Sequence, residues 1–279
     1  MTVFPCAKIN LGLNVVSRRP DGYHNLETVF YPIPLYDALE VHRMGTDFPS
    51  DVNCDLKVTG MEIEGREIDN LVVRAYNILA NDFELPRIHA HLFKQIPSQA
   101  GLGGGSSDAA YMIRLLDERF HINMGNKVME EYAARLGADC AFFITAEAAF
   151  AQGIGNELEP VSAEDFRLDG LYLALVKPDV AVSTREAYSN IKPHKPLKSC
   201  RDIVLQPIET WRDELVNDFE SSIFSIYPII GEIKEKLYKK GAIYAQMSGS
   251  GSCVFALFNE IPSFEDDDFV GCYKNIMKL

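Results

Sequence analysis

The sequence of 279 residues has no closely spaced cysteines, no long apolar run and few basic residues for its size. None of its six cysteines forms a C-x-x-C pair, so the spacing predicts neither a zinc site nor a disulfide framework. The best apolar run, 141–146, is far shorter than the roughly 20 residues that a membrane-spanning helix needs, and it ends at Glu147. The first residues lack the basic and apolar regions of a signal peptide. We therefore expect a soluble, cytoplasmic protein with reduced thiols.

The net charge of the chain argues against certain classes of binding partner. Acidic residues outnumber basic ones by 40 to 27, and the formal net charge is −13. A polyanion such as nucleic acid, or an anionic membrane, is repelled by a chain of this charge. If the ligand is anionic, a few lysines and backbone N–H groups must attract it locally. We expect no nucleic-acid and no membrane partner, and either a monomer or a homodimer.

The amino-acid composition is typical of a globular protein, with 47% hydrophobic and 24% charged residues. Strands and helices mix without strict alternation, which favours an α+β fold in two domains. The polar, turn-rich stretch 155–170 predicts the boundary, giving domains 1–160 and 161–279. The expected strands cover 3–16, 26–33, 38–44, 88–93, 171–176, 242–247 and 252–258. The expected helices follow Asn70 and cover about 106–120, 127–136, 184–190 and 211–240.

The most informative stretch is the glycine-rich segment 97–110, PSQAGLGGGSSDAA. Glycines at 101 and 103–105 permit positive φ and close approach of the backbone to a ligand. The residues that follow suit a helix N-terminus, where unpaired N–H groups attract an anion. The segment is neither a Walker A motif nor a dinucleotide fingerprint. The pattern predicts a phosphate-binding loop, with a plain turn between strand and helix as the alternative.

Four further features carry chemistry of their own. Lys8 interrupts an apolar strand, so its ammonium either meets an anion or reaches water at a strand edge. Asp139 precedes an apolar run, where it either pairs with a cation such as Lys8 or caps the next segment. The turn 20–22 delivers Tyr23 and His24 to one place, either to hold a base or as plain surface. The second glycine-rich segment, 247–253, matters only if it folds against the first.

Together these segments resemble the 4-diphosphocytidyl-2-C-methyl-D-erythritol kinases, a family within the superfamily of galactokinase, homoserine kinase, mevalonate kinase and phosphomevalonate kinase. The PDGYH and GLGGGSS sequences are specific to this member family. The resemblance spans nearly the whole chain, in the stretches 7–28, 96–110, 136–144, 149–161, 177–188 and 248–256. It implies a two-domain α+β kinase fold with the active site in the cleft between the domains.

The resemblance also implies roles for individual residues. Lys8 and Asp139 match the catalytic lysine and aspartate of the family. Asn10, Tyr23, His24 and Tyr188 match its substrate-binding residues, with the two tyrosines on either side of the cytosine. The implied ATP-binding residues are Asn70, Leu71, Lys94, Pro97, Ser98, Gln99, Ala100, Gly101, Leu102, Gly103, Gly104, Gly105, Ser106 and Ser107.

The implied reaction is ATP-dependent phosphorylation of the 2-hydroxyl of 4-diphosphocytidyl-2-C-methyl-D-erythritol, in the non-mevalonate route to isoprenoid (terpenoid) precursors. Mg²⁺ is the expected companion of ATP, and no protein residue is assigned as its ligand. Two alternatives stay open from the sequence: a sibling kinase of the homoserine or mevalonate type, and a nucleotide-binding regulator without catalysis. Dependence on the cytidine group separates the first, and turnover of ATP separates the second.

Overall fold

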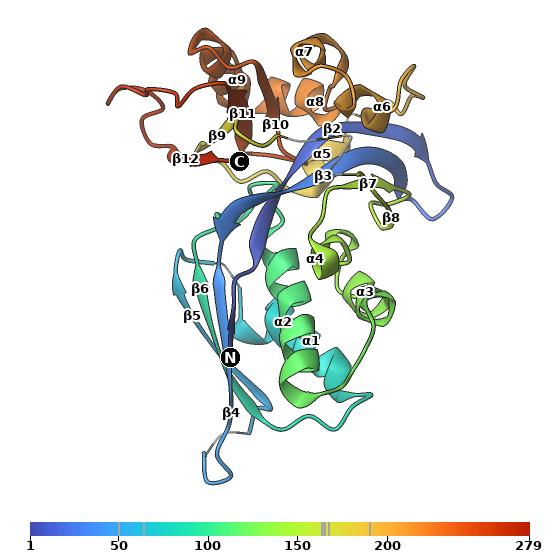
Figure 1. The fold of residues 1–279 in the computed structure, drawn as a ribbon, viewed down its shortest axis with the longest axis vertical. Helices are drawn as coiled ribbons and strands as arrows, with labels where there is room; N and C mark the ends of the chain where they lie inside the picture. The colour runs from blue at the N-terminus through green and yellow to red at the C-terminus, as the bar shows by residue number, and fades with distance from the viewer. Residues whose placement is uncertain (50, 64, 163–165, 167, 190) are drawn as a thin grey trace. The chain divides into compact units, whose positions relative to one another are not determined.

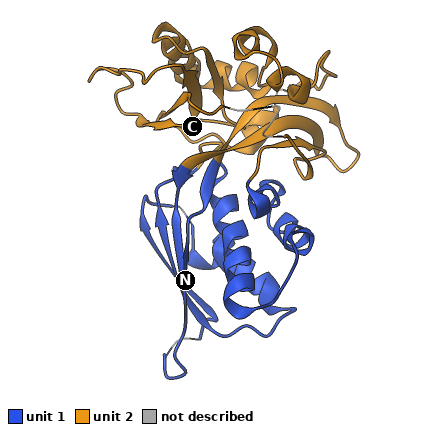
Figure 2. Cartoon of the chain, viewed as in Figure 1, with its two compact units in different colours: residues 1–7, 35–98, 103–146 blue, residues 8–34, 99–102, 147–279 orange. Residues whose placement is uncertain are grey.

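The computed structural model describes residues 1–49, 51–63, 65–162, 166, 168–189 and 191–279 (Figure 1). The chain forms two compact units that interleave along the sequence (Figure 2). Unit 1 consists of residues 1–7, 35–98 and 103–146, and unit 2 consists of residues 8–34, 99–102 and 147–279. Both strands and helices occur in each unit, which confirms the α+β prediction. The predicted domains are consecutive in sequence instead, and their boundary at residue 160 stays a prediction.

Unit 1 is a four-stranded sheet, in the order β1-β4-β6-β5, with helices packed on one face (Figure 1). Its strands are β1 (Thr2–Val3), β4 (Ala38–Arg43), β5 (Cys54–Gly60) and β6 (Ile88–Lys94). Its helices are η1 (Glu67–Asp69), α1 (Leu71–Ala80), α2 (Gly104–Phe120), α3 (Asn126–Ala134), η2 (Ala138–Cys140) and α4 (Phe142–Thr145).

The sheet of unit 1 follows the alternation that the sequence shows. Leu39 and Leu92 are cross-strand neighbours on the buried face, whereas Glu40 and His91 are neighbours on the opposite face. Successive side chains of a strand point to opposite faces, so each strand contributes every second residue to the core. The parallel pair β5–β6 requires a crossover, and η1 and α1 lie within it. This arrangement leads from β6 directly into the glycine-rich segment and α2.

Unit 2 contains two four-stranded sheets, in the orders β2-β3-β7-β8 and β10-β11-β9-β12. Their strands are β2 (Cys6–Arg18), β3 (His24–Tyr36), β7 (Ala149–Gln152), β8 (Glu157–Pro160), β9 (Tyr172–Lys177), β10 (Tyr244–Met247), β11 (Val254–Phe258) and β12 (Tyr273–Lys278). The first two residues of β2 and the last two of β3 belong to unit 1. The helices are α5 (Thr184–Ser189), α6 (Cys200–Val204), η3 (Ile208–Thr210), α7 (Trp211–Glu214), α8 (Phe219–Ile226) and α9 (Pro228–Lys239). No helix among the described residues is both long and apolar enough to cross a bilayer.

The expected helical stretch 211–240 is helical over most of its length, but it is not continuous. The structure divides it into α7, α8 and α9. Leu215 leaves the helical region with φ −90° and ψ 93°, and Tyr227 has φ −125° and ψ 75° before Pro228. The helical conformation is disfavoured for a residue that precedes proline, so Pro228 accounts for the break at Tyr227. Residues 163–165 and 167 of the expected boundary stretch, and Asn190 at the end of an expected helix, lie outside the described residues.

The sequence indicates no role for the acidic segment near the C-terminus. In the structure this segment is held by ion pairs within unit 2. Asp268 is buried, and its carboxylate lies 2.8 Å from Lys236 Nζ and 2.5 Å from Lys240 Nζ, both near the end of α9. The backbone N–H of Glu265 donates to the same carboxylate at 2.8 Å. These contacts hold the chain before β12 against α9.

Candidate active site

The glycine-rich segment takes the backbone conformations that its composition predicts. Gln99, Gly101 and Gly103 have φ of 51°, 71° and 71°, in the left-handed region that favours glycine. Gly103 precedes α2, which begins at Gly104, two residues earlier than expected. The first N–H groups of α2 have no partner within the helix, because a helix leaves its first turn unpaired. The expected order of strand, glycine loop and helix N-terminus is confirmed, and phosphate binding by this loop stays a prediction.

In unit 1 the start of α2 packs tightly on the end of β6. A Cβ atom at Gly104 would lie 2.9 Å from Ile96 Cγ2 and 3.3 Å from Lys94 Nζ. Lys94 is 4% exposed, and its ammonium contacts two carboxylates, those of Asp37 and Asp108. The distance to Asp108 Oδ2 is 2.7 Å. Lys94 therefore ties β6 to α2, and its side chain is occupied by these two partners.

Asp37 and Asp108 are polar core residues that the sequence reasoning missed. Asp37 Oδ1 accepts hydrogen bonds from the backbone N–H groups of Gln95 and Ile96, at 2.6 and 2.9 Å. Asp108 Oδ1 is buried and accepts no hydrogen bond from the described residues. The available signal was a carboxylate between two buried strands, and another within the apolar face of α2. Side chains of this kind are expected to pair when buried.

Burial and charge shift the pKa values of this cluster in defined directions. Burial raises the pKa of Asp108 well above its ordinary value, against the opposing attraction of Lys94. Burial acts to lower the pKa of Lys94, but Asp108 and Asp37 outweigh it and the net pKa is raised. One ammonium thus faces two carboxylates in a site closed to water.

The remaining unit 1 residues gather around the first turn of α2. The side chain of Asn70 accepts a hydrogen bond from the N–H of Val72 at 2.9 Å, which confirms the expected cap of α1. Leu71 Cδ1 lies 3.8 Å from where a Cβ of Gly105 would be. Burial raises the pKa of Cys140 to about 11, although a hydrogen bond with Ser106 acts to lower it. Asp139 precedes Cys140 in η2 and is half-buried.

In unit 2 Lys8 is 3% exposed, which excludes the alternative of a strand-edge lysine in water. Its ammonium donates to Asn10 Oδ1 at 2.5 Å and to the carbonyl oxygen of Gly101 at 3.0 Å. It also lies 5.1 Å from the centroid of the Phe30 ring, within the range of a cation–π contact. The structure thus joins two of the predicted site residues, Lys8 and Asn10, with the glycine loop. The pairing of Lys8 with Asp139, which belongs to the other unit, stays a prediction.

The second glycine-rich segment folds against the first within unit 2. This contact is the condition on which the second segment was expected to form part of the site. Ser248 Oγ donates to the carbonyl oxygen of Gly101 at 2.8 Å, and the N–H of Cys253 donates to that of Ala100 at 3.3 Å. Ser248 was not among the predicted site residues. The signal for it was the pair of glycine-rich segments, but their spacing along the chain does not reveal that they meet.

Among the predicted base-binding residues, two aromatic rings contact each other directly. The rings of His24 and Tyr188 are stacked on each other, with centroids 4.9 Å apart and planes inclined by 16°. Tyr188 also meets the ring of Phe219 edge-on at 4.8 Å. Tyr23 is 64% exposed at the turn between β2 and β3. The structure brings His24 and Tyr188 together, and cytosine binding between Tyr23 and Tyr188 stays a prediction.

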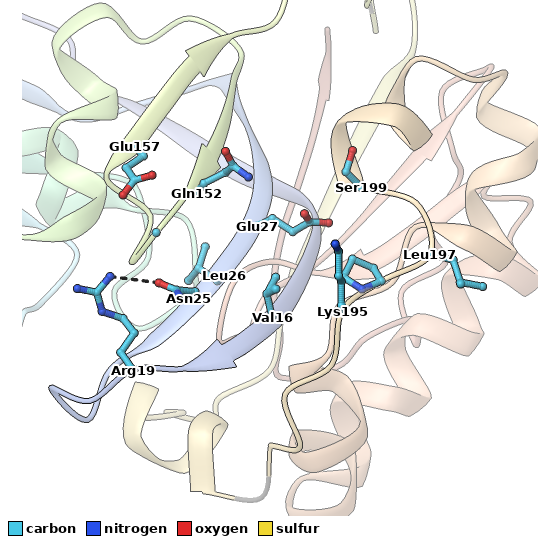
Figure 3. Close-up of a pocket in the computed structure, with 12 residues that line it drawn as sticks. Val16, Arg19, Asn25, Leu26, Glu27, Gln152, Glu157, Lys195, Leu197 and Ser199 are labelled. Carbon is cyan, nitrogen blue, oxygen red and sulfur yellow. Dashed lines mark hydrogen bonds between the residues drawn. The ribbon is translucent and has the colours of Figure 1, made fainter.

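Unit 2 also contains an open pocket of about 640 Å³ between β3, the β7–β8 turn and the chain before α6 (Figure 3). Its lining mixes charges of both signs, including Arg19, Glu27, Glu157 and Lys195. Arg19 is held by Asn25 through a hydrogen bond of 3.1 Å, drawn dashed in Figure 3. None of the predicted site residues lines this pocket.

No three histidine, cysteine, aspartate or glutamate side chains come together as a metal cage in the part of the chain that the structure describes. In nucleotide sites Mg²⁺ keeps several waters and is bound by phosphate oxygens with one or two carboxylates. The donor chemistry of unit 1, a half-buried Asp139 near the first turn of α2, fits such a shared site.

Comparison with known proteins places these features in a family. Residues 70–147 match the model of the GHMP kinases N terminal domain, and residues 201–268 match that of the GHMP kinases C terminal. A 4-diphosphocytidyl-2-C-methyl-D-erythritol kinase of Bacteroides fragilis is 53% identical over 280 residues, covering 100% of both chains. One of Bacteroides thetaiotaomicron is 51% identical, covering 98% of this chain and 99% of the relative.

A solved structure agrees with the sequence relatives. The crystal structure of a 4-(cytidine 5'-diphospho)-2C-methyl-D-erythritol kinase superimposes with a TM-score of 0.75 at 31% identity. The match covers 92% of this chain and 90% of that one. With this identity over its whole length, the chain belongs to the 4-diphosphocytidyl-2-C-methyl-D-erythritol kinase family of the GHMP kinases.

Proposed function

We propose that this chain transfers the γ-phosphoryl group of ATP to the 2-hydroxyl of 4-diphosphocytidyl-2-C-methyl-D-erythritol, giving the 2-phosphate and ADP on the route to isoprenoid precursors. The observation that carries the proposal is the full-length likeness to kinases of that name, at 53% identity. The buried, oriented ammonium of Lys8 beside the glycine loop supports it, because a fixed cation beside a phosphate loop suits phosphoryl transfer. We place the reaction in the cytoplasm.

The glycine loop and the N-terminus of α2 hold the phosphates in this proposal. Backbone N–H groups at a helix N-terminus bind anions through unpaired donors and the helix dipole. This local attraction explains how a chain of net charge −13 accepts a triphosphate. Asn70 and Leu71 lie at the start of α1 beside Gly105, where they border the nucleotide. Lys94 contributes by holding β6 against α2 through Asp37 and Asp108, since its ammonium is already occupied.

The transfer itself forms a bond between the substrate oxygen and the γ-phosphorus while the bond to the leaving ADP oxygen breaks. Phosphoryl transfer passes through a loose transition state, so catalysis depends on positioning and charge stabilisation. Lys8 stabilises the charge on the transferring group. Asp139 orients the 2-hydroxyl and takes up its proton. Mg²⁺ would supply neutralisation of charge on the triphosphate when bound.

Substrate recognition rests on the cytidine group. His24 and Tyr188 lie together in unit 2, and Tyr23 is exposed nearby in the sequence at the start of β3. Aromatic rings hold bases by stacking, worth about 1–3 kcal/mol per base. Asn10 is buried next to Lys8 and positions the methylerythritol part.

The test is a turnover assay with the purified chain, ATP, Mg²⁺ and one acceptor at a time. ADP release should occur with 4-diphosphocytidyl-2-C-methyl-D-erythritol, and phosphorus NMR should find the new phosphate on the 2-oxygen. Homoserine and mevalonate, which carry no base, serve as the control acceptors. Release with either of these and none with the cytidylated acceptor would assign a sibling kinase. Binding of ATP without turnover of any acceptor would assign a regulator.

A further inference from the structure

The ammonium of Lys8 is held by a carbonyl oxygen that another side chain also holds. Gly101 O accepts a hydrogen bond from Lys8 Nζ at 3.0 Å and one from Ser248 Oγ at 2.8 Å. The position of this oxygen therefore sets the position of the lysine. All three residues belong to unit 2.

Ser248 makes a second link to the same group of residues. Its Oγ accepts a hydrogen bond from the backbone N–H of Asn10 at 3.3 Å, and Asn10 Oδ1 also accepts from the Lys8 ammonium. Ser248 is fully buried, so water does not compete for these contacts. One hydroxyl thus connects Gly101 and Asn10, the first through its carbonyl oxygen and the second through its backbone N–H.

The position of Ser248 depends in turn on Asn217. The side-chain amide of Asn217 donates to the carbonyl oxygens of Met247 and Gly249, at 2.7 and 2.8 Å, on either side of Ser248. Its Oδ1 accepts the N–H of Phe219 at 3.0 Å, at the first residue of α8. Asn217 is 3% exposed and uses both ends of its amide. The second glycine-rich segment is therefore anchored to the start of a helix.

We propose that Ser248 and Asn217 are positioning residues for phosphoryl transfer, which fix the Lys8 ammonium through the carbonyl oxygen of Gly101. The inference rests on the proposed function, in which Lys8 stabilises the transferring group. A loose transition state offers little covalent chemistry to the protein, so the rate depends on where this charge lies. Loss of the Ser248 hydroxyl removes the restraint on Lys8 without deleting any group that touches the substrate.

The first experiment compares Ser248→Ala with Ser252→Ala in the turnover assay. Ser252 is an equally buried serine of the same segment, and its hydroxyl donates to Val180 O at 2.6 Å, away from Gly101. S248A should lower kcat about tenfold, the effect of one lost hydrogen bond, with an unchanged KM for ATP. S252A should keep the kcat of the unsubstituted chain. Equal losses in both variants would overturn the proposal.

The second experiment asks whether Ser248 acts through Lys8. In a Lys8→Ala background, adding S248A should change kcat by less than about twofold, because coupled residues are not additive. Asn217→Asp keeps the acceptor for Phe219 and removes both donors, so it should reproduce S248A. A full tenfold loss in the Lys8→Ala background would assign Ser248 a purely structural role and overturn the inference.

The third experiment separates this inference from the proposed function. Acylation of Lys8 by a water-soluble ester, followed by mass spectrometry without any substrate, reports how firmly the amine is held. Lys8 should label about tenfold faster in S248A and N217D than in the unsubstituted chain and in S252A. Equal labelling in all four proteins would overturn the inference even if turnover is normal. Absence of turnover with the expected labelling would overturn only the proposed function.

Discussion

A Cβ atom at Gly101 would lie 1.9 Å from the carbonyl oxygen of Ser248. The two glycine-rich segments therefore touch backbone to backbone at this point, where φ of Gly101 is +71°. Both the contact and the conformation exclude a side chain, because a left-handed residue other than glycine costs about 1–2 kcal/mol before any clash. An added side chain at Gly101 would meet a closer contact than one at Gly104 or Gly105 of the same loop.

Gly101→Ala should consequently lower kcat/KM by at least about tenfold and reduce the melting temperature. The strain of roughly 1–2 kcal/mol and the displaced Ser248 carbonyl both act on the Lys8 contact. Gly125→Ala is the matched control, since Gly125 has φ −77° and a Cβ atom there would meet no heavy atom of the described residues within 4 Å. Steady-state kinetics and thermal unfolding of both variants measure the difference. A G101A protein as active as G125A would contradict the close packing of the two segments.

Asp139→Asn should lower kcat by about 10²–10⁴, the usual contribution of general acid–base help, while ATP still binds. The substitution keeps the size of the side chain and removes its charge and its capacity to take a proton. Asp82→Asn is the control, because Asp82 is an exposed carboxylate of the same unit that pairs with Tyr132 and Arg135. Unchanged turnover in D139N would remove Asp139 from the reaction.

Tyr188→Ala should raise the KM for the cytidylated substrate by about 5- to 150-fold and leave the KM for ATP unchanged. The reason is loss of base stacking worth about 1–3 kcal/mol. Tyr23→Ala should act in the same direction if the cytosine lies between the two rings. Tyr36→Ala, at another exposed tyrosine, provides the comparison. Equal KM values for the substrate in Y188A and Y36A would locate the base elsewhere.

Lys94→Met should destabilise the fold by about 3–5 kcal/mol, because it leaves the buried acidic pair Asp37 and Asp108 without its cation. Asp108→Asn, which leaves a balanced pair of Lys94 and Asp37, should cost much less. Urea unfolding of the two variants at pH 7 tests the difference. Similar losses in both would show that the cluster is not electrostatically coupled.

The same cluster predicts a pH effect of defined sign. The folded pKa of Asp108 lies above its unfolded value of about 3.9. Its contribution to stability is therefore complete below about pH 4 and lost as the pH rises through the raised pKa. D108N should accordingly show a flatter decline of unfolding free energy between about pH 4 and pH 8. An identical pH profile for D108N and the unsubstituted chain would contradict the raised pKa.

Asp268 predicts the opposite sign. Hydrogen bonds from Lys236 and Lys240 lower the pKa of Asp268 well below its ordinary value. A depressed pKa adds stability above the unfolded value of about 3.9, and this is lost as the pH falls toward the folded value. Asp268→Asn should lower the melting temperature at pH 7 and narrow its gap to the unsubstituted chain below about pH 4. Asp266→Asn, in the same acidic run, is the control.

The sequence predicted well those elements whose signals are local. Asn70 caps α1, and alternation along 88–93 defined β6 almost to the residue. It missed β5 and β12, whose residues become strands through pairing with partners far along the chain. It also missed the hairpin of β7 and β8, in which β7 pairs with the distant β3. A pairing of this kind is tertiary, and the local pattern of Glu157–Pro160 reads as a turn.

The site shows the same division. The glycine loop could be predicted because a run of glycines indicates unusual backbone conformations. Lys8 could be predicted because it is a charged residue within an apolar strand. Ser248, Asn217 and Asp37 were not evident, because their roles arise from backbone carbonyl and N–H groups that distant segments bring to them. Residue type does not reveal a hydrogen bond to main-chain atoms of a segment that lies far along the chain.

The interleaving of the two units has a consequence for biosynthesis. Every segment of unit 1 has been translated once residue 146 is complete, so this unit can form early on the ribosome. Most of β2 and β3 is made among the first residues but belongs to unit 2, whose core extends to Phe269. These two strands find their sheet neighbours once β7 and β8 have been made, but the core that covers Leu13 and Val15 is complete only after Phe269. Chaperone dependence during translation should therefore concentrate on this early hairpin.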